Sequence, residues 1–244
     1  MMRMLTFARR CAREILRDPL NLLFGLGFPI VLLLLLSAIQ ANIPVPLFEI
    51  QRLAPGLAVF GLSFMTLFSS TLIARDRESA LLQRLYTTPL HSADYILGYM
   101  LPMLPIAAAQ SAVCYLIAIL LGLPVTIHIV YAILLILPVA LFYISLGLFC
   151  GSVFNVKQVG GICGALLTNL SAWLSGVWFD LELVGGAFGS IAHALPFVHA
   201  VELQRAAVSG SLAGAWPHLL VVLGYTAATT AGAALLFLRQ MNRQ

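Results

Sequence analysis

Four side chains in the last quarter of the 244-residue chain are of types that bind metal ions: His193, His199, Glu202 and His218. Histidine nitrogens and carboxylate oxygens are common zinc ligands. Their spacing does not match the H-E-x-x-H pattern, which places two histidines on one face of a helix. Scattered histidines of this kind are more often structural or interfacial, so we predict no metal site.

Enzymatic nucleophiles and phosphate-binding loops are equally poorly matched. Ser175 is followed by glycine, but Ala172 and Trp173 occupy positions at which an intramembrane serine protease needs its Gly-x-Ser-Gly element. A nucleotide-hydrolysing P-loop requires G-x-x-x-x-G-K-[ST], and Lys157 is the only lysine and is followed by glutamine. We therefore predict a protein that is not an enzyme and holds no cofactor of its own.

The densest group of charged side chains lies in residues 75–95, between two long apolar runs. Within it, three leucines repeat at helical spacing: Leu81, Leu82 and Leu85. Glu78 and Arg84 fall away from that stripe, and Pro89 disfavours helical geometry in the residue before it. The pattern predicts a short amphipathic helix between two membrane spans. It is either a solvated linker or, as we favour, a docking helix for a partner.

The same stretch resembles a loop of a known family. Residues 77–85 read Arg-Glu-Ser-Ala-Leu-Leu-Gln-Arg-Leu and are followed by Thr88 and Pro89. Type-2 ABC transporter permeases commonly carry Arg-Glu-x-Gly-Thr-Leu-Glu-Arg-Leu and then Thr-Pro between the spans of their first hairpin. Ala80, Leu81 and Gln83 replace the family's Gly, Thr and Glu. The resemblance implies that a separate ATPase is contacted through five residues: Arg75, Glu78, Leu82, Arg84 and Leu85.

The elements that position this loop are apolar. The chain is 61% hydrophobic and 9% charged, with a mean hydropathy of +1.00. Soluble domains carry about 25% charged residues, so the deficit indicates an integral membrane protein. Six runs without a charged residue reach the roughly 20 residues that a bilayer requires: 20–39, 53–74, 95–121, 129–150, 159–179 and 219–238. We predict an all-α membrane protein of six transmembrane helices, forming a single domain over residues 1–244.

Basic residues set the expected orientation. With the N-terminus inside, 11 of the 13 arginines and lysines face the cytoplasm, and only Arg52 and Arg205 lie outside. The positive-inside rule therefore places both termini in the cytoplasm. It also explains the net charge of +4 without a nucleic-acid partner. The four cysteines match no metal framework, and we expect no structural disulfide.

Two further segments flank the spans. Residues 3–17 are amphipathic, with apolar residues on one face and arginines, among them Arg10, on the other. They predict an interfacial helix, which is either a simple topology signal or the elbow helix with which type-2 permeases open. Residues 180–217 predict an extracytoplasmic hairpin, re-entrant or on the surface, in which Glu202 and Arg205 pair at i, i+3 and Gly210 ends a helix.

Within the spans, local patterns predict bends and close contacts. Pro29 predicts a kink in the first span, and Pro102 and Pro105 predict a bent or broken third span. Small residues spaced four apart at 147–151 and 160–164 predict close helix approach.

A substrate path would need apolar surface with a few polar groups. Phe64 and Phe68 share a stripe of the second span, and Asn169 and Trp173 share a face of the fifth. Such aromatic stripes and polar groups more often serve packing between helices or face lipid. We predict these four residues as the candidate path.

The resemblance completes the expectation. It implies a permease subunit of an ATP-driven exporter in a prokaryotic cell (inner) membrane, moving a hydrophobic or amphipathic drug, antibiotic or peptide outward. Its partners would be two ATPase copies, which bind ATP and Mg, and a second permease copy in a homodimer. The alternatives are an exporter of lipid-linked polysaccharide and an ATP-independent carrier or channel. The absence of charged residues from every span argues against an ion-coupled carrier.

Overall fold

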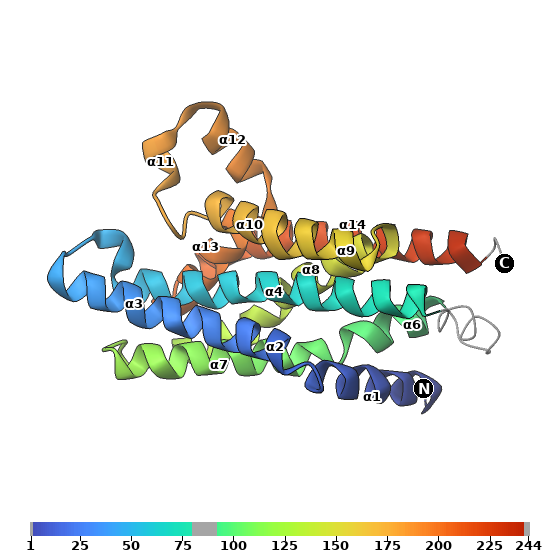
Figure 1. The fold of residues 1–244 in the computed structure, drawn as a ribbon. Helices are drawn as coiled ribbons and strands as arrows, with labels where there is room; N and C mark the ends of the chain where they lie inside the picture. Colours follow the sequence, from blue (N-terminus) through green and yellow to red (C-terminus); the bar gives the residue numbers. More distant parts are fainter. Residues whose placement is uncertain (1, 80–91, 242–244) are drawn as a thin grey trace.

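The computed structural model describes residues 2–79 and 92–241, and this part of the chain is helical with no strand (Figure 1). The elements up to the middle of the chain are α1 (Met2–Leu16), α2 (Pro19–Leu22), η1 (Leu23–Gly27), α3 (Phe28–Asn42), η2 (Pro46–Phe48), α4 (Ile50–Glu78), α6 (Ser92–Met100) and α7 (Met103–Leu120). Those that follow are α8 (His128–Val153), α9 (Val156–Val159), η3 (Gly160–Leu167), α10 (Thr168–Leu174), α11 (Leu181–Val184), α12 (Gly186–Ala194), α13 (Pro196–Ser209) and α14 (Leu212–Met241). The predicted all-α class is confirmed.

Within residues 2–79 and 92–241, five helices are long and apolar enough to cross a membrane: Leu23–Asn42, Ile50–Glu78, Asp94–Leu120, His128–Val153 and Leu212–Arg239. The run expected as the fifth of six spans is helical through α9, η3 and α10 but is not one of these five. Its helix ends at Leu174, before the apolar run does, and Lys157 and Asn169 make it more polar. The six-span count therefore remains a prediction.

Helix α4 is the centre of the bundle. It packs against α3, α7, α8 and α13, and nearly all of its residues from Leu53 to Ala74 are buried. At about 1.5 Å per residue, its 29 residues span roughly 43 Å, which exceeds the roughly 30 Å hydrocarbon core. Its charged last turn therefore extends beyond the apolar layer.

Glycines permit the closest approach in the bundle, between α4 and α8. A Cβ added to Gly147 would lie 1.8 Å from Ser69 Oγ and 2.4 Å from the Thr66 carbonyl oxygen. One added to Gly151 would lie 2.6 Å from the carbonyl oxygen of Ser70. The predicted close packing at 147–151 is confirmed.

The corresponding prediction at 160–164 is wrong. A Cβ on Gly160 or Gly161 would meet nothing within 4 Å, and one on Gly164 would make only ordinary contact with Leu67. These glycines lie in η3, a π-helical segment, where Gly160 and Gly161 face open space within this chain.

Prolines interrupt two spans as predicted. Helix α6 ends at Met100 and α7 begins at Met103, with Pro102 between them. In the first span, the π-helical η1 immediately precedes Pro29, which is at the start of α3. Both distortions arise because proline lacks the amide hydrogen that the helical ladder needs.

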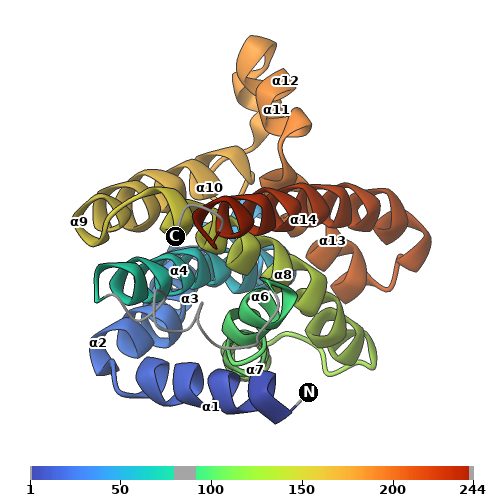
Figure 2. The ribbon, with the colours of Figure 1, turned by 90° about the vertical axis from the view of Figure 1, so that its right-hand side faces the viewer.

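The two ends of the bundle differ (Figure 1), and Figure 2 looks onto the end that carries both termini. At the end that carries both termini, α1 lies across the bundle and packs mainly on α6. At the opposite end, α11 and α12 project from the bundle, whereas α13 packs between α8, α14 and α4. Here Glu202 and Arg205 form the predicted i, i+3 ion pair at 2.7 Å, and Gly210 ends α13 with a φ of +80°.

Candidate functional site

The last turn of α4 consists of four consecutive charged residues: Arg75, Asp76, Arg77 and Glu78. Successive residues of an α-helix are rotated by about 100°, so these four side chains leave the helix in different directions. Each of them contacts a different part of the protein. We call this turn and its contacts the α4 junction.

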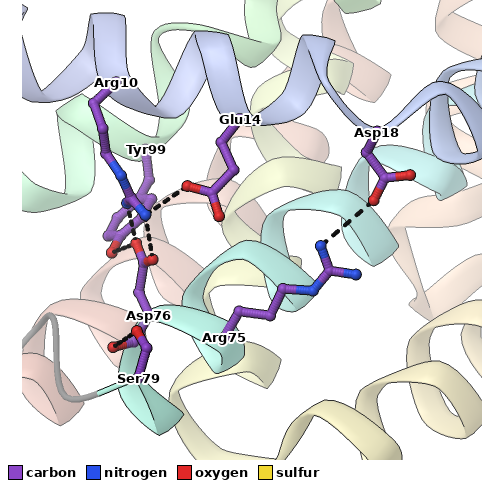
Figure 3. A network of polar contacts seen from close by, with 7 residues as sticks. All are labelled: Arg10, Glu14, Asp18, Arg75, Asp76, Ser79 and Tyr99. Carbon is purple, nitrogen blue, oxygen red and sulfur yellow. Dashed lines mark hydrogen bonds and ion pairs between the residues drawn. The ribbon is translucent and has the colours of Figure 1, made fainter.

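Asp76 is the buried centre of the junction, with 1% of its surface exposed. Its carboxylate accepts hydrogen bonds from Nη1 and Nη2 of Arg10 in α1, at 2.5 and 2.6 Å. It also accepts one from the Tyr99 hydroxyl in α6, at 2.7 Å (Figure 3). A bidentate arginine and a phenol satisfy a buried carboxylate well, because charge-assisted hydrogen bonds are the strongest in proteins.

Arg10 is also held from its own helix. Its Nη2 lies 2.5 Å from Glu14, one turn further along α1. The hydrogen bond with Asp76 raises the pKa of the Arg10 guanidinium, outweighing the opposite effect of burial. Arg10 thus points into the bundle and meets Asp76, although the sequence pattern places it on the polar face of α1. The buried face of α1 is formed instead by Phe7, Ala8, Cys11 and Ile15.

The other three residues of the junction reach three more places. Arg75 pairs with Asp18, between α1 and α2, at 3.5 Å. Arg77 Nη1 donates to the carbonyl oxygens of Gly151 and Phe154, at 2.7 and 3.2 Å, at the end of α8. Glu78 accepts a hydrogen bond of 3.0 Å from the backbone nitrogen of Val156, the first residue of α9.

These contacts follow helix-end chemistry. The last carbonyl groups of a helix and the first amides of the next one lack partners within their helices. The macrodipole makes the former end negative and the latter end positive. A cation at Arg77 and an anion at Glu78 therefore match the turn between α8 and α9. The result is that any displacement of the end of α4 is shared with α1, α6, α8 and α9.

Of the five residues predicted to contact an ATPase, Arg75 and Glu78 belong to the α4 junction. Leu82, Arg84 and Leu85 lie outside the described residues. Sequence reasoning did not identify Asp76 or Arg77 as anchors, nor their partners. One signal was available: an aspartate that continues a long apolar helix needs a cation, and Arg10 lies in the other amphipathic segment on the same side.

A second feature is an open groove of about 540 Å³ beside α4. It is lined mainly by aromatic and small residues: Phe24, Phe28, Phe60, Phe64, Leu67, Gly164, Thr168, Asn169, Ala172, Trp173 and Trp178. Three of the four residues predicted for a substrate path, Phe64, Asn169 and Trp173, are among them. Phe68 is not; a Cβ on Gly25 would lie 2.7 Å from its ring, so Phe68 packs against η1.

The groove has the composition of a small-molecule site. Its volume falls within the roughly 300–1,000 Å³ of ligand pockets. Trp173 is 52% exposed, and the amide nitrogen of Asn169 donates to the Ala165 carbonyl at 2.8 Å. An apolar wall with one amide group suits an amphipathic molecule better than a sugar chain.

The histidines at the opposite end bind one another. The Nδ1 atoms of His199 and His218 are 2.8 Å apart, and His199 Nε2 lies 2.9 Å from the carbonyl oxygen of His193. Since the carbonyl accepts, His199 Nε2 donates, and its Nδ1 then accepts from His218. Among the described residues, no three His, Cys, Asp or Glu are placed to hold a metal ion.

The model of a family described as ABC-2 type transporter matches residues 2–208, which include the α4 junction and the groove. No curated protein matches the sequence.

Proposed function

Because the chain belongs to the ABC-2 type transporter family, we propose that it is the permease subunit of an ATP-driven exporter that moves a hydrophobic or amphipathic compound outward. Membership makes it a multi-pass membrane protein of a family whose membrane subunits typically work with an ABC ATPase. The direction, the energy source and the cargo are the proposed part.

The α4 junction is the observation that carries the proposal. Its Arg77 and Glu78 begin the stretch, residues 77–89, that resembles the family's ATPase-contacting loop. A force applied there reaches the last turn of α4, which is tied to α1, α6, α8 and α9 by hydrogen bonds of 2.5–3.2 Å. Closure of the ATPase would therefore move several helices of the bundle together.

The groove supports an apolar or amphipathic cargo. It is bordered by α4, which carries the junction at one end and Phe60 and Phe64 further along. Movement of α4 would thus change the groove directly. The exposed ring of Trp173 places the groove within reach of a molecule dissolved in lipid.

The proposed assembly has two permease copies and two ATPase subunits, in a prokaryotic cell membrane, with both termini in the cytoplasm. The junction then faces the ATPase, which binds ATP and Mg. This orientation also places 11 of 13 basic residues on the cytoplasmic side.

Reconstitution tests the proposal. The permease would be co-purified with a candidate ABC ATPase from the same organism and placed in proteoliposomes with a fluorescent amphipathic dye. We expect ATP-dependent dye movement away from the ATPase side, and none with an ATPase whose P-loop lysine is replaced. Dye movement without ATP would indicate a carrier or channel, and failure of the two subunits to co-purify would refute the partnership.

A further inference from the structure

A second cavity, of about 340 Å³, lies at the end of the bundle opposite the α4 junction. We call it the outer chamber. Its lining is Leu47, Arg52, Ser175, Gly176, Asp180, Leu181, Glu182, His193, Val198, Glu202 and Arg205. The residues come from η2, the start of α4, the segment after α10, and α11 to α13, so the chamber sits where the projecting part joins the bundle.

The chamber gathers negative charge. Nine acidic residues occur in the chain, and four of them lie at this end: Glu49, Asp180, Glu182 and Glu202. Three of these four line the chamber, against two arginines. With His193 neutral, its lining carries a net charge of −1.

The ion pair between Glu202 and Arg205 does not neutralise the other two carboxylates of the chamber, those of Asp180 and Glu182. Glu202 lies 2.7 Å from Arg205 Nη1, and Nη2 of Arg205 donates to the Gly176 carbonyl at 3.1 Å. Asp180 accepts a hydrogen bond from the backbone nitrogen of Glu182 and caps α11. Within the described residues, no arginine or lysine forms an ion pair with Asp180 or Glu182.

The remaining walls are apolar. Leu47, Leu181 and Val198 come from three different segments of the chamber. A ligand that fits both kinds of wall has an apolar body and a positively charged group. The volume admits a molecule of drug-fragment size.

We propose that the outer chamber binds the ammonium end of an amphipathic amine, with Glu182 and Asp180 as its charge partners. This rests on the proposed export function, and it narrows the cargo to cationic amphiphiles. A neutral amphiphile would lack the ion pair with the two carboxylates, and an anionic one would be repelled by them.

The chamber and the groove lie one after the other along the same two segments, α4 and residues 173–178. Along α4, Arg52 of the chamber precedes Phe60 of the groove by eight residues, or about 12 Å of helix rise. Along the other wall, Trp173 and Trp178 line the groove, whereas Gly176 lines the chamber. A Cβ on Gly56 would lie 3.1 Å from Val177, so Val177 packs closely on α4 between these levels. An amine leaving the groove would meet the chamber after passing Val177.

Calorimetry on the purified full-length permease in lipid nanodiscs tests the proposal, with empty nanodiscs subtracted. The probes are 4-phenylbutylamine, 4-phenylbutanol and 4-phenylbutyrate, which share one apolar body and differ in charge. We expect the amine to bind about tenfold more tightly than the alcohol, because both can donate a hydrogen bond to a carboxylate but only the amine also forms an ion pair with it. The carboxylate probe should bind most weakly, because the lining carries a net negative charge.

Variants locate the binding. Glu182→Gln should weaken amine binding roughly fivefold to tenfold and leave alcohol binding unchanged. Asp180→Asn should act in the same direction while keeping the cap of α11, since both residue types cap well. Arg52→Gln should tighten amine binding because it removes a competing cation. The matched control is Glu49→Gln, which removes an exposed carboxylate at the same end that does not line the chamber.

Equal binding of the three probes would overturn the proposal. So would equal weakening by Glu49→Gln and Glu182→Gln, since that would indicate general surface charge. Asp180→Asn decides the matter if Glu182→Gln fails to fold. The assay contains neither ATP nor ATPase, so an amine-binding permease without ATP-driven transport would refute only the proposed function. ATP-driven export without amine preference would refute only the chamber.

Discussion

Replacing Arg10 by alanine should destabilise the protein by about 3 kcal/mol. The substitution leaves the Asp76 carboxylate, 1% exposed, without the guanidinium that donates two of its hydrogen bonds. Breaking a buried ion pair by removing one partner costs about 3–5 kcal/mol. We take the lower end because the Tyr99 hydroxyl still donates to Asp76, at 2.7 Å, and because the Arg10 side chain is 36% exposed.

Replacing the other partner of the ion pair, in Asp76→Asn, should destabilise the protein less. In Asp76→Asn, Tyr99 retains an acceptor, and the half-exposed Arg10 can turn to water and to Glu14. We expect Asp76→Asn to destabilise the protein by about 1–2 kcal/mol. The double variant Arg10→Ala/Asp76→Asn should be destabilised by less than the sum of the two single variants, because it leaves no buried charge unpaired. Such non-additivity is the sign of a direct interaction.

Thermal unfolding of the permease in nanodiscs, followed by tryptophan fluorescence, measures the effect. For a chain of this size, about 3 kcal/mol corresponds to a Tm decrease of roughly 6–12 °C. Arg9→Ala removes an exposed arginine of the same helix and is the matched control. If Arg10→Ala lowers Tm no more than Arg9→Ala, the ion pair does not stabilise the junction and our account of it is refuted.

Four further predictions concern other parts of the structure. Gly147→Ala should destabilise the bundle by several kcal/mol, because its Cβ would lie 2.4 Å from a backbone oxygen of α4. Gly160→Ala is the control and should change Tm little, because its Cβ would lie in open space. Similar Tm values for the two variants would contradict the close packing of α4 and α8. Trp173→Ala and Asn169→Ala should alter which compounds are exported in a vesicle efflux assay, whereas Phe68→Ala should lower stability; an unchanged profile in the first two would place the path elsewhere. Burial raises the pKa of the Cys11 thiol to about 12, so N-ethylmaleimide at neutral pH should leave Cys11 unmodified. In a background without the native cysteines, Gln51→Cys should react with an impermeant reagent from outside and Ser79→Cys only after the membrane is opened; outside labelling of Ser79→Cys would reverse the orientation.

Much of the fold could be predicted because apolar run length and proline position act locally. Pro102 interrupts the third span whatever surrounds it, and Gly210 ends α13 in a conformation that favours glycine. The Glu202–Arg205 pair is fixed by helical spacing alone. These features depend on a few neighbouring residues, which the sequence displays directly.

Features that depend on distant partners could not be predicted. Glycine spacing is the same kind of signal at 147–151 and 160–164, yet only at the first would an added Cβ lie within 3 Å of the α4 backbone; Gly160 and Gly161 face open space, and Gly164 makes ordinary contact with Leu67 of α4. Likewise, the arginines of α1 look equivalent, and only the fold shows that Arg10 alone meets Asp76, 66 positions away. The groove was located in part, because Asn169 and Trp173 share a helix face, whereas Phe68 was assigned by its stripe and turned out to pack on Gly25.

The α4 junction also limits how the chain can tolerate changes in length. Its four contacts depend on one helical register, so deleting one residue from α4 between Ser70 and Arg75 would turn the last turn by about 100° and withdraw it by about 1.5 Å. Asp76, Arg77 and Glu78 would then all miss their partners together, while the Gly151 contact at Ser70 stayed in place. A single-residue deletion here should be far more damaging than any single substitution, and an insertion equally so. Homologous chains should therefore keep a constant number of residues between the position of Ser70, which contacts Gly151, and the four charged residues of the α4 junction. The identity of the residues between them can differ.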